Sequence, residues 1–286
     1  MLSSPLADRV IAFLHSMPRF VPDSELRLWL DGRALGWVRP ALAEALQAQS
    51  PERIRLDDSG LHVNAGDTCE TRSQHLQTWM IALRDQGLLL NWRDENMLLT
   101  VTGQPYLVME RAAFRSLGLC TPSVHMNGWV ATPDGVALWV AERSPHKFVD
   151  PGKLDNLVGG GVSAGESLAT GLEREAWEEA GLHFRRVPSP ASRLHIHRRL
   201  GEGVQEEWIA VFDHWLPAHF LPTNQDGEVA DARLLPVAQA LAMVLDGHFT
   251  WDAGLVILDG LLRQRHFGPD GVRIEETLRT LGYRGQ

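Results

Sequence analysis

GGVSAGESLATGLEREAWEEAGL, residues 160–182, is the segment from which the rest of the chain can be interpreted. It places Glu175, Glu178 and Glu179 at i, i+3 and i+4, and on a helix such positions are neighbours with Cβ atoms roughly 5–6 Å apart. Three like charges at that spacing repel one another, so the helix gains no stability from them. Because carboxylate oxygens are the ligands that hard cations such as Mg²⁺ prefer, the cluster indicates a metal site. The alternative is a solvated acidic helix face.

The flanking residues predict a helix across this cluster. Ser167 is a favourable N-cap residue, and Gly181 lies where a C′ glycine ends a helix. Glu175 and Glu179 fall at the edge of an apolar stripe, so we expect them to be partly shielded from water. The stripe is formed at helical spacing by Leu168, Leu172, Ala176 and Ala180.

The spacing of the fixed residues favours the metal site. The segment resembles the Nudix box and fills every fixed position of that motif: Gly160, Glu166, Arg174, Glu175, Glu178, Glu179 and Gly181, with Ala176 and Leu182 at its two apolar positions. The resemblance implies an α/β/α sandwich. It also implies a hydrolase that cleaves a diphosphate linkage with a divalent cation, Mg²⁺ with Mn²⁺ as the alternative.

Length and composition describe an ordinary globular protein. The chain has 286 residues, of which 44% are hydrophobic and 22% charged, and its net charge of −9 argues against a nucleic-acid or anionic-membrane partner. Two cysteines do not suggest a disulfide framework, and no apolar run approaches the ~20 residues of a membrane span. The first residues lack the basic region of a signal peptide. We therefore expect a cytoplasmic protein that acts on a small molecule, with a homodimer left open.

The hydrophobic pattern predicts an α/β protein of two domains, a small α+β domain over residues 1–117 and the Nudix domain with C-terminal helices over residues 118–286. In the first, helices are expected over 5–16, 40–49 and 75–86, and strands over 27–30, 34–38, 98–101 and 105–108. In the second, the expected strands are 124–131, 136–142, 153–158, 194–198 and 206–215. Further helices are expected over 236–245, 253–265 and 273–281.

Polar side chains outside the box supply further candidates. Arg143, Lys147 and Lys153 precede the box, and each could bind a diphosphate or serve only as a surface cation. Glu228 follows a polar turn and is our choice for an additional metal ligand or general base. Glu206 and Glu207 compete with it for that role.

Histidines and tryptophans give weaker signals. His195 and His197 form an HxH pair, but alternate residues on a strand need no metal to explain them. His125 and Asn127 share a strand face, where either could touch substrate. The chain has ten tryptophans against two tyrosines. We expect most of them in the core and one or two to stack on a heteroaromatic substrate.

The wider chain resembles the Nudix subgroup related to thiamine pyrophosphokinase. The resemblance rests on HMNGWV (125–130), the run from Arg143 through PGKLDNLVGGGVSAGES, PTNQDGEV (222–229) and LDGLLRQ (258–264). A preceding domain of about this size is also typical of the subgroup. The resemblance implies hydrolysis of oxidised or otherwise damaged thiamine diphosphate to the monophosphate. Asp155 and Asn156 lie in that run and are assigned, with Asn127, to substrate binding.

Roles follow for the box residues. Glu175, Glu178 and Glu179 would hold the cation together with Gly159, and the glycines from 159 to 161 would let the backbone approach the phosphates. Arg174 would orient Glu178, Glu166 would order the loop, and Gly160 and Gly181 would be structural. Either Glu175 or Glu228 would take the proton from the attacking water.

Three other interpretations remain open. One is hydrolysis of another nucleoside or sugar diphosphate. A second is an enzyme resembling isopentenyl-diphosphate isomerase, which requires a catalytic cysteine that Cys120 does not match in position. The third is a non-catalytic ligand sensor, although such proteins usually lose box glutamates and carry a DNA-binding domain.

Overall fold

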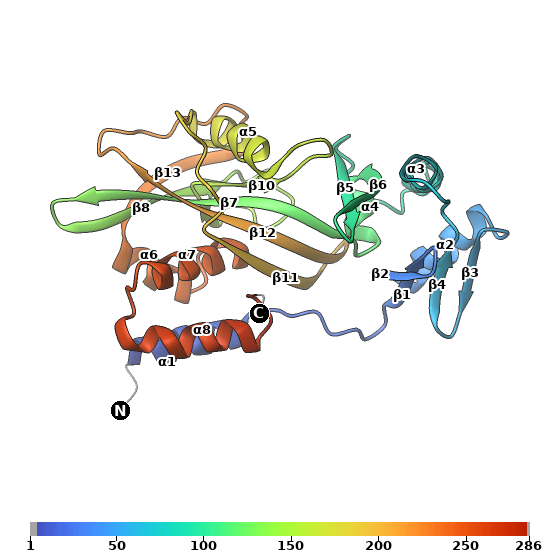
Figure 1. Ribbon diagram of the computed structural model, residues 1–286, viewed down its shortest axis with the longest axis horizontal. Coiled ribbons are helices and arrows are strands. Elements are labelled where there is room, and N and C mark those ends of the chain that lie inside the picture. Colours follow the sequence, from blue (N-terminus) through green and yellow to red (C-terminus); the bar gives the residue numbers. More distant parts are fainter. Residues whose placement is uncertain (1–4, 285–286) are drawn as a thin grey trace.

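The computed structural model describes residues 5–284, and its elements form two groups (Figure 1). The first group contains β1 (Leu26–Leu30), β2 (Arg33–Val38), α2 (Pro40–Gln49), β3 (Ile54–Asp57), β4 (Gly60–Val63), α3 (Cys69–Asp85), β5 (Asn96–Val101), β6 (Gln104–Glu110) and α4 (Arg111–Ser116). The second contains β7 (Cys120–Thr132), β8 (Gly135–Arg143), β9 (Leu154–Asn156), β10 (Val158–Gly161), α5 (Leu168–Ala180), β11 (Ser192–Leu200), β12 (Gly203–Leu216), β13 (Val229–Pro236), α6 (Val237–Leu245), α7 (Trp251–Arg263) and α8 (Gly271–Thr280), together with α1 (Pro5–Ser16).

The first group has a sheet of order β2-β1-β4-β3 and a separate β5-β6 hairpin. The strands predicted over 27–30 and 34–38 are confirmed as β1 and β2, which form a hairpin whose turn uses Asp31 at φ 47° and Gly32 at φ 78°. Two successive residues of positive φ match the twist of the flanking strands. Leu28 and Leu30 of β1 are buried in one core with Leu46 of α2 and Met80 of α3.

The second group is built on a sheet of order β11-β12-β7-β8-β13, to which β10 adds by pairing with β7 and β9 by pairing with β8. Alternate residues of β12 enter different cores: Ala210 and Phe212 pack under α5, whereas Ile209 and Val211 pack with α6 and α7. A sheet with helices on both faces is the α/β/α sandwich predicted from the sequence (Figure 1).

Helix α1 does not pack with the elements that follow it in the chain. Val10 and Leu14 are buried in the core that contains α6, α7 and α8, and Figure 1 shows α1 lying alongside α8. Residues 5–16 are therefore spatially part of the second group, in contrast to the predicted unit of residues 1–117. The boundary near residue 118 remains a prediction for the rest of the chain.

Several elements differ from the expected ones. β3, β4 and α4 were not expected, because short strands and a six-residue helix carry little periodic signal. α3 begins at Cys69 rather than His75, because Thr68 caps it in a reciprocal capping box with Thr71. No helix within residues 5–284 has the length and apolar character needed to cross a membrane.

Candidate active site

The box forms helix α5, as predicted. Ser167 caps its N-terminus, because the Ser167 hydroxyl accepts a hydrogen bond from the Thr170 N–H at 3.1 Å. Gly181 ends it with φ 62°, a left-handed conformation that favours glycine. Three of the four stripe residues are buried under the sheet, whereas Leu168 in the first turn is 38% exposed.

The helix turns two carboxylates inward and leaves one at the surface. Glu175 and Glu179 are 9% and 8% exposed, while the Glu178 side chain is 35% exposed. The Gly159 N–H donates to Glu179 Oε2 at 2.7 Å. Gly160 leaves room for Glu175, since a Cβ on Gly160 would lie 2.0 Å from Glu175 Oε1. Strand β10 and the acidic helix face are therefore in direct contact.

Burial changes the proton affinity of both inner carboxylates. Burial, and then the negative charge of Glu175, raise the pKa of Glu179 well above its ordinary value, against the hydrogen bond from Gly159. Burial also raises the pKa of Glu175, although Arg174 opposes it. The protein alone therefore compensates the two negative charges incompletely.

Arg174 ties the box together. Its guanidinium donates to Glu166 Oε1 at 2.7 Å, to Glu175 Oε1 at 2.8 Å and to Glu178 Oε2 at 3.1 Å. It also donates to the Gly161 carbonyl at 2.9 Å. Glu166 in turn accepts from the Ser163 N–H at 2.9 Å, in the loop between β10 and α5. The arginine thus fixes two box carboxylates and the loop before them.

The residue types fit a hard divalent cation, although the side chains are not gathered around one point. No group of three or more His, Cys, Asp or Glu side chains is arranged to hold a metal ion within residues 5–284. Arg174 takes the place of a cation beside Glu175 and Glu178, and Glu179 is held toward Gly159. Two buried carboxylates of raised pKa are what a divalent cation would relieve, so the donor set fits.

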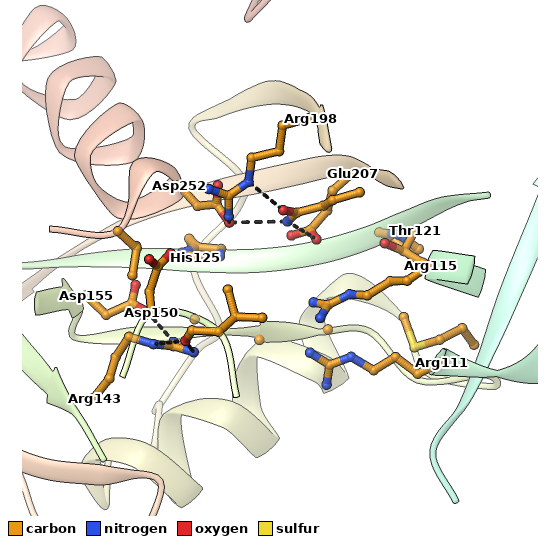
Figure 2. Close-up of a pocket in the computed structure, with 18 residues that line it drawn as sticks. Arg111, Arg115, Thr121, His125, Arg143, Asp150, Asp155, Arg198, Glu207 and Asp252 are labelled. Carbon is orange, nitrogen blue, oxygen red and sulfur yellow. Dashed lines mark hydrogen bonds and ion pairs between the residues drawn. The ribbon is translucent and has the colours of Figure 1, made fainter. Parts of the chain in front are cut away.

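Two small cavities lie on this side of the molecule, and the first of them adjoins β10. The first, of about 90 Å³, is lined by Gly159, Gly160 and Gly161 and by charged side chains from both element groups (Figure 2). The second, of about 60 Å³, shares Arg111, Arg115, Arg143 and Val149 with it. The box carboxylates line neither cavity, since Gly160 stands between Glu175 and the first cavity.

The three predicted cations before the box have different surroundings. Arg143 lines both cavities, but it also donates to Asp155 Oδ2 at 2.7 Å and to the Val149 carbonyl at 2.9 Å. Arg143 therefore holds the loop after β8 as well as facing the site. Lys147 lines the second cavity and is paired with Glu228. Lys153 lines neither cavity and pairs with Asp150 at 3.3 Å.

The predicted amide contacts are buried instead. Asn127 is 0% exposed, and its Nδ2 donates to Asp213 Oδ1 at 3.1 Å and to the Val256 carbonyl at 3.2 Å. Asn156 is 1% exposed and bonds Asn127 and His125. Neither amide lines the cavities, and both are bonded within the protein, so their assignment to substrate binding stays a prediction. Asp155 and His125 do line the first cavity.

Within residues 5–284, Glu228 forms two ion pairs, and neither is with a residue of the box. Its carboxylate is held by Lys147 and by Arg93, whose Nη1 is 3.3 Å from Glu228 Oε1. Glu228 lines neither cavity. Burial lowers the pKa of Lys147, and the negative charge of Glu179 opposes that shift.

The remaining candidates lie elsewhere. His195 contacts Glu206 at 3.3 Å and stacks on Trp208, and His197 stacks on Phe20, as ordinary strand residues would. Burial raises the pKa of the Cys120 thiol to about 12, so this cysteine stays protonated. Within residues 5–284 no tryptophan lines either cavity.

Sequence reasoning missed several cavity residues. Arg111 and Arg115 come from α4 of the first group, and Asp252 lines the first cavity with them. Glu207, which the sequence offered as a rival to Glu228, lines the first cavity as well. Phe148, which is 52% exposed, lines the second. The spacing of Arg111 and Arg115 at i and i+4 was the one local signal, because it places both on one helix face.

Comparison with known proteins places this geometry in a family context. The family model described as "NUDIX domain" matches residues 124–256, and a "Domain of unknown function (DUF4743)" matches residues 11–121. Nudix hydrolase 24, chloroplastic, of Arabidopsis thaliana is 33% identical over 280 residues, covering 92% of this chain and 73% of that protein. Nudix hydrolase 20, chloroplastic, of the same plant is 31% identical, covering 70% of this chain and 55% of that protein. The chain thus spans about half the length of the second relative.

A crystal structure from Deinococcus radiodurans superposes with a TM-score of 0.40 at 20% identity, covering 57% of this chain and 97% of that one.

Proposed function

The chain belongs to the Nudix hydrolase family, and from that premise we propose that it is a Mg²⁺-dependent pyrophosphohydrolase of damaged thiamine diphosphate. The reaction cleaves the diphosphate linkage with water and leaves the monophosphate and inorganic phosphate. The observation that carries the proposal is the cavity floored by Gly159 to Gly161, backed by the carboxylates of α5 and faced by arginines.

Each part of the site has a task in this proposal. Glu175, Glu178 and Glu179, with Gly159, would hold the cation, which supplies electrophilic charge stabilisation to the diphosphate when bound. Arg174 keeps Glu175 and Glu178 in place. The glycine backbone allows phosphate oxygens to approach, and Arg143 and Lys147 face them as cations.

Geometry favours Glu175 over Glu228 as the proton acceptor. Neither carboxylate lines a cavity, but Glu175 contacts Gly160 directly behind the floor of the first one, whereas Glu228 is engaged by Lys147 and Arg93. The attacking water would therefore lose its proton to Glu175, one turn of helix from Glu179.

A heteroaromatic substrate is supported by the resemblance of the chain and by Phe148. This ring is half exposed beside the second cavity, where stacking on a pyrimidine would add about 0.5–1.5 kcal/mol beyond area burial. At the far side of the first cavity, Asp252 Oδ1 is buried and has no hydrogen-bond partner among the described residues. Such an acceptor suits an N–H donor of the substrate.

Side-by-side kinetics test the proposal. The panel contains oxythiamine, oxothiamine and thiamine diphosphates, ADP-ribose, a nucleoside triphosphate and isopentenyl diphosphate, each with Mg²⁺. We expect kcat/KM on a damaged analogue to exceed that on thiamine diphosphate by about tenfold or more, because one unpaired polar group costs roughly 1–3 kcal/mol. Much faster turnover of any of the last three substrates would reject the thiamine-type substrate, and only the assignment as a Nudix hydrolase would be kept.

Glu178→Gln serves as the inactive control in that assay. The change keeps the volume of an outward-facing side chain and removes its charge, so kcat should fall on the order of 10²-fold while the fold is retained. Turnover close to that of the parent, with the same Mg²⁺ dependence, would remove Glu178 from the proposed metal site.

A further inference from the structure

The two cavities form one crevice between the first and second element groups. Arg111 and Arg115, on α4, reach it from one side, and Arg143, at the end of β8, reaches it from the other (Figure 2). Five cations and one carboxylate line the second cavity: Arg93, Arg111, Arg115, Arg143 and Lys147 against Glu202. Each of the five cations is also paired with a carboxylate, so the net positive charge is small. What favours an anionic ligand is the set of N–H donors that these pairs leave free toward the cavity.

Both arginines of α4 are anchored but still have donors to spare. Arg111 Nη1 bonds Glu95 Oε2 at 2.8 Å, and Arg115 Nη1 bonds Glu202 Oε1 at 2.8 Å. A guanidinium has five N–H donors, and each of these bonds uses one nitrogen. The two side chains are 28% and 21% exposed, and both point into the crevice (Figure 2).

The position of α4 is fixed against the box loop. The Ala164 N–H donates to the Asn96 carbonyl at 2.7 Å, and Met97 forms an isolated bridge with Ser163. On the same side, the Arg111 N–H donates to the Glu95 carbonyl at 2.9 Å. The residues just before α5 are thus linked through β5 to α4, which holds its arginines in register with the active site.

Electrostatics connect Arg111 to the box itself. Burial lowers the pKa of Arg111, but the negative charges of Glu95, Glu207 and Glu175 raise it by more. Glu175, one of these three carboxylates, belongs to the box. A cation here would neutralise phosphate charge beside the acidic helix.

We propose that Arg111 and Arg115 bind the phosphate groups of the substrate, so that the N-terminal domain completes the active site of the hydrolase. This proposal rests on the proposed diphosphate chemistry but not on the thiamine moiety. Arginine recognises phosphate through paired N–H donors, which the crevice leaves available. Cavities of about 90 and 60 Å³ are far smaller than the roughly 300–1,000 Å³ of a pocket for a whole ligand, so they suit its charged groups.

Single Arg111→Gln and Arg115→Gln variants test the proposal with the panel diphosphate that the parent hydrolyses best. We expect KM to rise about tenfold or more in each variant, with kcat changed far less, because charge-assisted bonds to the ground-state phosphates are lost. The dependence of KM on salt should become shallower than in the parent. Arg55→Gln, at an exposed arginine of β3, is the matched control and should leave KM unchanged.

Three outcomes would overturn the assignment. The first is KM and its salt dependence within twofold of the parent in both variants. The second is a KM that stays normal while inhibition by inorganic phosphate weakens, which would make the crevice a site for free phosphate. The third is an equal rise of KM in Arg111→Gln and in Arg111→Lys, although the lysine keeps a cation beside Glu95. If the parent itself hydrolyses no diphosphate of the panel, the proposed function fails before these variants are compared.

Discussion

At the level of single residues, the site depends on the absence of a side chain at Gly160. The Glu175 carboxylate occupies the space that a Cβ would need, with Oε1 at 2.0 Å and Cδ at 2.1 Å from its position. Because Glu175 is buried and bonded to Arg174, it has little room to move aside. The glycine is therefore required by this contact, and no unusual backbone angle is involved.

We expect Gly160→Ala to lower kcat/KM by roughly tenfold to a hundredfold, since a misplacement of about 1 Å in a catalytic group can cost 10²-fold. The free energy of unfolding should fall by about 1–3 kcal/mol, as in other overpacked sites. Steady-state kinetics and thermal melting measure the two effects. Gly201→Ala is the control, because a Cβ there meets nothing within 4 Å. Parent-like kinetics in Gly160→Ala would show that Glu175 can occupy another position.

Among the secondary-structure elements, those with local signals were predicted and those fixed by distant contacts were not. Helix α5 was expected because Ser167, Gly181 and the apolar spacing all lie within it. The burial of Asn127 could not be predicted, because it depends on α7, where the Val256 carbonyl bonds the amide and Gly260 makes room for it. Without that information, Asn127 was assigned to substrate binding. The role of α4 could not be predicted, since it depends on distant contacts: Arg115 bonds Glu202, and β5, which precedes α4, bridges to Ser163 through Met97.

The ion pair between Glu25 and Arg199, which joins the two element groups, gives a pH-dependent prediction. Glu25, just before β1, accepts two hydrogen bonds from Arg199 of β11, one of them at 2.7 Å from Nη2. These bonds lower the pKa of Glu25 to about 2. A lowered pKa means that folding favours the ionised form. The stabilisation is therefore complete above the ordinary value of about 4.5 and is lost as the pH falls toward 2.

Glu25→Gln should lower the free energy of unfolding by about 1 kcal/mol at pH 7, a modest value because Arg199 is half exposed. Urea denaturation at pH 7, 4 and 3 should show the gap to the parent closing as the pH falls. Glu44→Gln provides the comparison, because Glu44 of α2 is exposed and forms no ion pair within residues 5–284. A gap that stays constant from pH 7 to pH 3 would mean that the charge of Glu25 contributes nothing.

At the level of the whole molecule, the two element groups have separate hydrophobic cores. Leu46 of α2 belongs to the core of the first group, while Leu14 of α1 belongs to the core beneath α6, α7 and α8. The chain therefore starts in the second group, crosses to the first and returns. A cut at residue 118 would remove α1 from the helices it covers, so the spatial unit around the hydrolase site includes residues from both ends of the chain.

Paired truncations in the two cores test whether this division holds during unfolding. Leu14 and Leu46 are both 0% exposed, so Leu14→Ala and Leu46→Ala should each cost about 2–5 kcal/mol in their own core. Native-state hydrogen exchange should then show lost protection in α7 and α8 for Leu14→Ala, and in α2 and α3 for Leu46→Ala. Equal loss across all four helices in both variants would mean that the groups unfold together. In that case the contacts of β5 with the box loop, and of Arg115 with Glu202, couple the two groups so strongly that neither core unfolds without the other.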